Sequence, residues 1–69
     1  MDMVLTTLKT AQRLDRPVVI VYDSAEGLTQ RRVYVRKIDG GKLFAYCTAK
    51  HSLRQFKLEN ILSAVIPEE

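Results

Sequence analysis

Cysteine, histidine and glycine are scarce in this chain of 69 residues, and each scarcity excludes a class of protein. Cys47 is the only cysteine, so no disulfide can form within the chain, and a lone thiol indicates a reducing, cytoplasmic setting. His51 is the only histidine and has no cysteines clustered around it, which argues against a metal site. Of the three glycines, Gly40 and Gly41 mark a hairpin turn, and no glycine-rich phosphate-binding loop is present.

Long apolar segments and catalytic constellations are missing as well. The longest apolar run covers residues 17–22, which is far too short to span a bilayer, and no apolar leader opens the chain. No Ser-His-Asp set or paired-carboxylate site stands out, and the position of His51 four residues after Cys47 does not make it a base for that thiol. We therefore expect no membrane association, no enzymatic activity and no cofactor.

The composition is typical of one small globular domain, which we assign to residues 1–69. The apolar fraction is 46%, the value of a folded chain rather than a disordered one. A chain of this size buries only about 60% of its extended surface, so we expect a thin core and modest stability. No linker, repeat or low-complexity segment divides the chain.

Positive charge is concentrated in the middle of the chain. The net charge is only +3, but residues 31–57 carry eight basic side chains and one acidic side chain, a formal charge of +7. The first 30 residues carry −1, and the tail after residue 57 carries −3. If the fold gathers the central charges on one surface, that surface will attract anionic ligands.

The hydrophobic pattern predicts one helix followed by five short strands. Apolar residues recur at three- and four-residue spacing over residues 3–14, which indicates an amphipathic helix that begins at Asp2 as N-cap and ends before Pro17. The predicted strands cover residues 18–23, 29–38, 42–47, 53–58 and 61–66. A single 3₁₀ turn is expected at residues 59–60. This order predicts a mainly β (α+β) domain, a small five-stranded barrel with the N-terminal helix capping one open end.

Alternation in the second strand places basic and aromatic residues together. Val33 and Val35 face one side of the strand, and the other side carries Arg32, Tyr34 and Arg36. Such a face suits single-stranded nucleic acid, because the charges follow the phosphates while the ring stacks on a base. The alternative is a solvated strand face on which Tyr34 simply pairs across the sheet.

The third strand carries aromatic residues on one side only. Phe44 and Tyr46 share that side, and the opposite side holds Leu43, Ala45 and Cys47. We expect Phe44 to pack in the core and Cys47 to be a small buried apolar side chain. The role of Tyr46 is left open between core packing and a groove, since its hydroxyl needs a hydrogen-bond partner or water.

Two segments of the chain resemble the core of the WYL domain family. They are Leu-Phe-Ala-Tyr-Cys at residues 43–47 and Arg-Gln-Phe-Lys-Leu-Glu-Asn-Ile at residues 54–61. The elements that match the family in order are residues 18–22, 32–33, 40–41, 45–47 and 54–61. The Trp and Tyr of the family name are replaced by Gly41 and Lys42, and Asn60 stands where the family has Arg.

The resemblance implies an SH3-like or Sm-like barrel that acts as a regulatory ligand-binding module. In this family the module is usually attached to a DNA-reading domain of a prokaryotic transcription regulator, and its ligands are thought to be anionic, with single-stranded nucleic acid or nucleotides foremost. The 14 residues before the barrel leave no room for a DNA-reading domain. We therefore expect a stand-alone sensor, or one that works with a separate DNA-binding regulator.

Arg54 is the main candidate for binding an anion. It shares strand parity with Phe56 and Leu58, so it must lie at the barrel rim or be paired, because an isolated buried guanidinium is too costly. A guanidinium at the rim can bind phosphate through two parallel hydrogen bonds. The alternative is a structural ion pair with one of three carboxylates: Asp23, Asp39 or Glu59.

The predicted binding set joins Arg54 to neighbouring basic and polar residues. Arg32 and Lys57 would complete the anion site, with Tyr46 nearby or His51 as an additional donor. The full set of predicted ligand-binding residues is Arg54, Arg32, Lys57, Tyr46, His51, Arg36 and Tyr34.

Three functions stay open at this point. The first is a non-enzymatic WYL-type sensor that binds an anionic ligand, single-stranded nucleic acid or a nucleotide, and is linked to transcription regulation. The second is a protein-interaction or homo-oligomerisation barrel, because small barrels pair through edge strands and a thin core favours assembly. The third is an Sm-like RNA-binding protein in its own right, in which bases stack on Tyr34.

Overall fold

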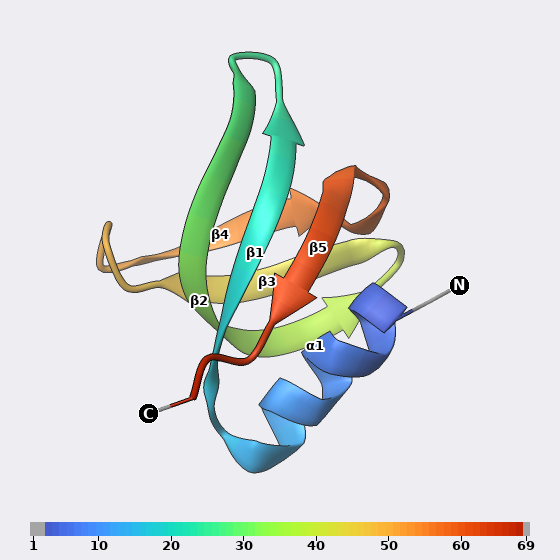
Figure 1. The fold of residues 1–69 in the computed structure, drawn as a ribbon, viewed down its shortest axis with the longest axis vertical. Coiled ribbons are helices and arrows are strands. Elements are labelled where there is room, and N and C mark those ends of the chain that lie inside the picture. Colours follow the sequence, from blue (N-terminus) through green and yellow to red (C-terminus); the bar gives the residue numbers. More distant parts are fainter. Residues whose placement is uncertain (1–2, 69) are drawn as a thin grey trace.

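A computed structural model describes residues 3–68, which form one helix and a five-stranded antiparallel sheet (Figure 1). The elements are α1 (Met3–Leu14), β1 (Pro17–Ser24), β2 (Gly27–Asp39), β3 (Lys42–Cys47), β4 (Ser52–Lys57), the 3₁₀ helix η1 (Leu58–Asn60) and β5 (Ile61–Val65). The predicted fold class is confirmed: the domain is mainly β, barrel-like, and carries one N-terminal helix. Asp2, the expected N-cap, lies outside the described residues.

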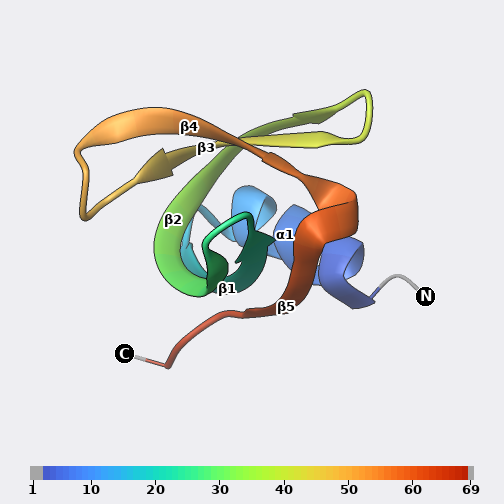
Figure 2. The same ribbon diagram turned by 90° about the horizontal axis from the view of Figure 1, so that it is seen from above.

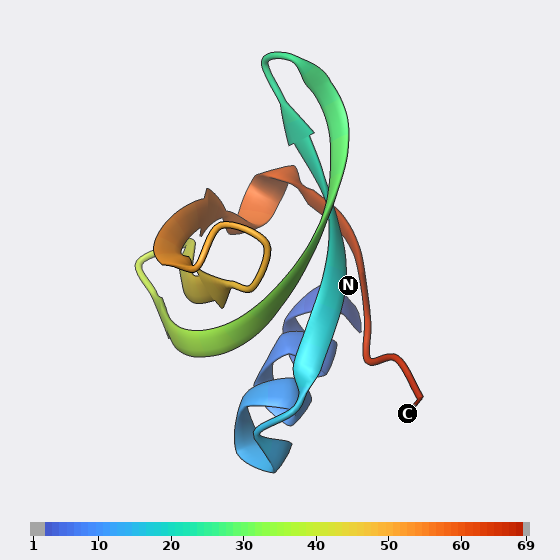
Figure 3. The same ribbon diagram turned by 90° about the vertical axis from the view of Figure 1, so that its left-hand side faces the viewer.

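The sheet is strongly curved, and its longest strand, β2, runs through the bend and belongs to both halves of the sheet. The strand order is β4-β3-β2-β1-β5, so β4 and β5 are the edges of the sheet among residues 3–68. The first part of β2 pairs with β1, and its last part pairs with β3. Each half of the sheet also contains an extra residue, Arg36 in β2 and Leu62 in β5, and such bulges increase the bend of a strand. Figures 2 and 3 show the result: β3 and β4 fold over β1 and β5, and α1 lies at one end.

The core fills the concave side of this curved sheet. Its buried residues are Leu8, Ala11, Val18, Ile20, Val33, Val35, Leu43, Ala45, Cys47, Phe56 and Ile61. Every strand contributes to it, and α1 contributes through Leu8 and Ala11, which are almost completely shielded from solvent. Burial of these apolar side chains is the main term that favours the fold.

The helix ends in a Schellman motif that turns the chain into β1. Asp15 adopts a left-handed conformation with φ of 56°, and its amide donates to the carbonyl of Gln12 at 3.2 Å. The amide of Arg16 donates to the carbonyl of Ala11 at 3.0 Å, so the last helical carbonyls are satisfied. Pro17 then begins β1. Within residues 3–68, no helix has the length and apolar character needed to cross a membrane.

Candidate functional site

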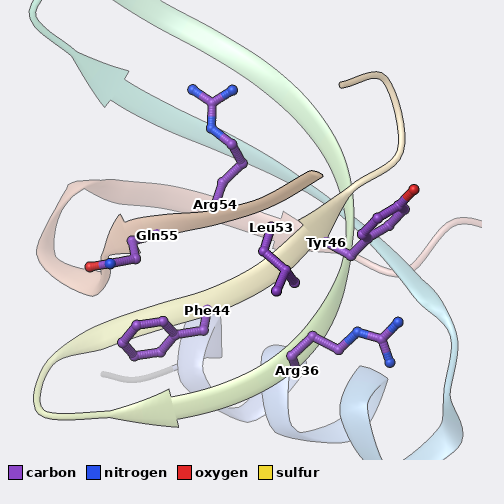
Figure 4. Close-up of a pocket in the computed structure, with 6 residues that line it drawn as sticks. All are labelled: Arg36, Phe44, Tyr46, Leu53, Arg54 and Gln55. Atoms are coloured by element: carbon purple, nitrogen blue, oxygen red, sulfur yellow. The ribbon is translucent and has the colours of Figure 1, made fainter. Parts of the chain in front are cut away.

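A shallow hollow of about 780 Å³ lies over β2, β3 and β4, mainly on the convex face of the sheet (Figure 4). We call it the outer hollow and define it by the residues that line it: Arg36, Phe44, Tyr46, Leu53, Arg54 and Gln55. Three of the predicted ligand-binding residues are therefore brought together here: Arg36, Tyr46 and Arg54.

The apolar floor of the outer hollow follows from the alternation of β3. Leu43 is fully buried, so its neighbour Phe44 points to the outer face, where it is half-buried like Tyr46. On β4, Gln55 lies opposite Phe44, and Leu53 lies opposite Tyr46. Leu53 is 67% exposed, so its apolar side chain is available to a ligand. The expectation that Phe44 packs in the core is wrong, because the opposite side of β3, which carries Leu43, Ala45 and Cys47, is the side that faces the core.

Arg36 is positioned by the bulge in β2. At this point β2 has one residue more than β3, so Arg36 has no partner on β3 and Lys37 is the residue opposite Phe44. The Nε2 atom of Gln12 donates a hydrogen bond of 3.0 Å to the carbonyl of Arg36, which ties the bulge to α1. The Nζ atom of Lys37 lies 6.0 Å from the centre of the Phe44 ring, within reach of a cation–π interaction. Two cations thus lie next to the aromatic floor, and the Nζ atom of Lys37 is also 3.9 Å from Oδ2 of Asp39, which balances part of its charge.

Arg54 lies where the outer hollow meets a second hollow. By strand register it faces Ala45, on the core side of β4, yet it is exposed, as predicted for an arginine at the rim. In Figure 4 its guanidinium points away from Phe44 and Leu53 and toward the β1–β2 ribbon. Among residues 3–68 Arg54 makes no ion pair, so the alternative of a structural pair with a carboxylate is not found there.

Two more predicted residues lie beside the outer hollow. The hydroxyl of Tyr46 is 3.5 Å from Nδ1 of His51, which sits in the β3–β4 turn with φ of 53°. Tyr34 lies opposite Tyr46 on β2 and is half-buried, so the tyrosines are cross-strand neighbours on the outer face. The basic and aromatic face predicted for β2 therefore continues across β3.

Arg32 and Lys57 lie apart from Arg54. Lys57 is next to Phe56 on β4 and on the opposite face from Arg54, where it lines a separate hollow near Gly41 and the β2–β3 turn. Arg32 lies further along β2, opposite Val19 of β1. The three residues predicted as one anion site thus do not share one hollow, because alternation and sheet curvature separate them. Whether each of them binds a ligand stays a prediction.

Three residues of the outer hollow were not predicted as ligand contacts: Phe44, Leu53 and Gln55. A signal for them exists in the sequence, since the Gly40-Gly41 turn sets the register of β2 and β3 and small residues mark the core side of β3. The described part of the chain contains no group of His, Cys, Asp and Glu side chains that could hold a metal ion, and Cys47 is buried.

Comparison with known proteins gives a likeness in fold. No protein-family model matches the chain, and no curated protein matches it significantly. The fold is similar to part of a solved structure, the proteasome accessory factor B/C (PafBC) of Arthrobacter aurescens, with a TM-score of 0.82 and 24% identical residues. The similarity covers 94% of this chain and 11% of the PafBC chain. This architecture is therefore found as a small part of a much longer protein.

Proposed function

We propose that this chain is a non-enzymatic regulatory module of the WYL type, which binds an anionic ligand on the outer hollow, with single-stranded nucleic acid as the best fit. One observation carries the proposal: aromatic, apolar and basic side chains from three strands gather around a single exposed hollow. Single-stranded nucleic acid presents the same mixture, stacked bases along a line of negative phosphates.

Five of the six residues that define the outer hollow, together with Lys37 beside it, have a role in this proposal. Phe44 and Tyr46 are the surfaces on which bases stack, and Leu53 extends that apolar floor. Arg36 and Lys37 stand at its edge, where they can contact phosphates. The amide of Gln55 offers both a donor and an acceptor to the edge of a base.

The charge distribution and the fold give further support. The segment with a formal charge of +7 coincides with β2, β3 and β4, the strands that form the outer hollow. The fold is shared with part of a protein named as an accessory factor, which is consistent with a regulatory role. We expect the module to act in the cytoplasm, linked to transcription through a separate DNA-binding regulator, since the motif order of residues 15–66 resembles the WYL family.

The test is a titration of the full chain with a fluorescent oligothymidine of about 12 nucleotides at low and moderate salt. We expect binding that weakens as salt rises, because phosphate contacts release counterions. Phe44→Ala should weaken binding about tenfold through loss of stacking, and Arg36→Gln should weaken it and reduce the salt dependence by one phosphate contact.

The matched control is Arg13→Gln, which removes the same charge from an exposed position on α1. This variant should bind the oligonucleotide like the parent chain. Absence of binding at low salt, or an equal loss in Arg13→Gln and Arg36→Gln, would show that the outer hollow is not the binding surface.

A further inference from the structure

The second hollow, of about 340 Å³, has no role in the function proposed above. It lies between the β1–β2 hairpin and β4, and this hairpin projects from the end of the barrel that is far from α1 (Figures 1 and 3). We call it the mouth site, and the residues of its lining that matter here are Tyr22, Glu26, Thr29, Arg31, Arg54 and Phe56.

The floor of the mouth site is a pair of aromatic rings in contact. The rings of Tyr22 on β1 and Phe56 on β4 meet edge to face, with their centres 5.0 Å apart and an interplanar angle of 78°. Phe56 is buried, and Tyr22 is half-buried. This contact joins strands that are not neighbours in the sheet, so the floor is held from both sides of the barrel.

Two arginines line the mouth site from different strands. Arg31 lies opposite Ile20, on the same side of β2 as the core residues Val33 and Val35, and it is half-buried. Arg54 approaches from the core side of β4. Among residues 3–68 neither guanidinium has an ion pair, although the exposed carboxylate of Glu26 also lines the hollow.

A half-buried arginine at a core-facing position is unusual without a partner, because partial burial removes water from the charge. In the mouth site an anion can supply that partner. Two guanidinium groups can hold phosphate oxygens with paired hydrogen bonds. A phosphate monoester carries a charge of about −1.5 to −2 at neutral pH, which suits two arginines better than the single charge of a phosphodiester.

We propose that the mouth site binds a phosphate monoester attached to a small organic group, either a mononucleotide or the terminal phosphate of a nucleic-acid strand. The volume of about 340 Å³ lies at the lower end of the range for small-molecule sites, so it suits a group of nucleotide size. The phosphate lies against Arg31 and Arg54, and the organic part covers the aromatic floor. This site does not depend on nucleic-acid binding in the outer hollow.

The first test is NMR on the labelled full chain with adenosine monophosphate, inorganic phosphate and adenosine as probes. The two phosphates should shift the backbone amide signals of Thr29, Arg31 and Phe56, whereas adenosine should leave them unchanged. No shift at these amides with millimolar adenosine monophosphate would overturn the proposal.

Variants then test the role of the arginines. Arg31→Gln and Arg54→Gln should each lower the affinity for adenosine monophosphate at least about tenfold, through loss of charge-assisted hydrogen bonds. Arg31→Lys keeps the positive charge but cannot make the paired hydrogen bonds of a guanidinium group, so it should lose less affinity than Arg31→Gln. This variant reports on binding even if Arg31→Gln folds poorly. Arg13 lies on α1, at the end of the barrel far from the β1–β2 hairpin. An equal loss of affinity for adenosine monophosphate in Arg13→Gln would refute the site.

Oligonucleotides distinguish the two sources of phosphate. If the ligand is a strand end, a 5′- or 3′-phosphorylated oligothymidine should bind more tightly than the unphosphorylated one, and Arg31→Gln should remove that difference. If the ligand is a mononucleotide, terminal phosphorylation should have no effect while adenosine monophosphate still binds. Shifts at Thr29, Arg31 and Phe56 report on the mouth site, and shifts at Phe44 and Tyr46 report on the outer hollow, so failure of the outer hollow and failure of the mouth site give different results.

Discussion

On β3, neighbouring side chains have opposite roles although both are large and apolar. Leu43 is fully buried in the core, whereas Phe44 is half-buried on the outer face beside Lys37. Their hydropathy alone does not distinguish them, because either side of this strand contains enough apolar character to form a core. The pairing with β2 decides the matter, since it aligns Leu43 with Ile38 and Ala45 with Val35 on the concave side.

Substitution by alanine at these two positions should give very different stabilities. Leu43→Ala leaves a cavity in a close-packed core and should cost about 2–5 kcal/mol of unfolding free energy. Phe44→Ala should cost about 1 kcal/mol or less, because mainly cross-strand contacts on an exposed face are lost. Urea unfolding of the two variants measures both values, and an equal or larger loss for Phe44→Ala would contradict the assignment of the faces.

At the scale of elements, α1 contributes more than a cap on the barrel. Its Gln12 side chain holds the carbonyl of Arg36 at the bulge, so the helix also sets where an outer-face cation stands. Its C-terminal turn places Asp15 in a left-handed conformation, which glycine adopts with less strain than aspartate. Asp15 also sets a negative charge at the negative end of the helix dipole.

Asp15→Gly should therefore stabilise the domain by about 0.5–1 kcal/mol. Asp15→Asn removes the charge but keeps a side chain that tolerates the left-handed region, so it should give a smaller gain. Thermal unfolding of both variants against the parent chain tests this order. A lower melting temperature for Asp15→Gly would mean that the side chain stabilises the turn in some other way.

For the whole molecule, curvature of the sheet separates two surfaces that carry basic side chains. The bulge in β2 leaves both Arg36 and Lys37 beside the outer hollow, whereas alternation puts Arg31 and Arg54 on the core side of their strands, at the mouth site. The edges at β4 and β5 are the places where the predicted homo-oligomerisation would occur. Four of the eight basic residues in the central segment are thus divided between two sides of one small barrel.

Local rules predicted most of the architecture. Helix periodicity, the Gly40-Gly41 turn and strand alternation lead to the observed elements, and they correctly place Arg32, Tyr34 and Arg36 on one side of β2. These local rules do not predict which residues, distant in the chain, the bulge in β2 and the curvature of the sheet bring together.

Pairing between strands that are distant in the chain therefore accounts for the residue groupings that the sequence did not predict. The grouping of Arg36 with Leu53 and Gln55, and that of Arg31 with Arg54, depends on pairing across the whole sheet. The resemblance to the WYL family singles out Arg54, but it gives no indication of Arg31 or of the outer position of Phe44.

The most direct measurement is an NMR titration of the labelled full chain with oligothymidine, with each amide shift mapped onto the structure. Binding in the outer hollow predicts that the largest shifts fall on Arg36, Phe44, Tyr46, Leu53 and Gln55, with little change along α1 and β5. Saturating shifts confined to α1 or β5, or no shifts at low salt, would contradict the proposal that this face binds single-stranded nucleic acid.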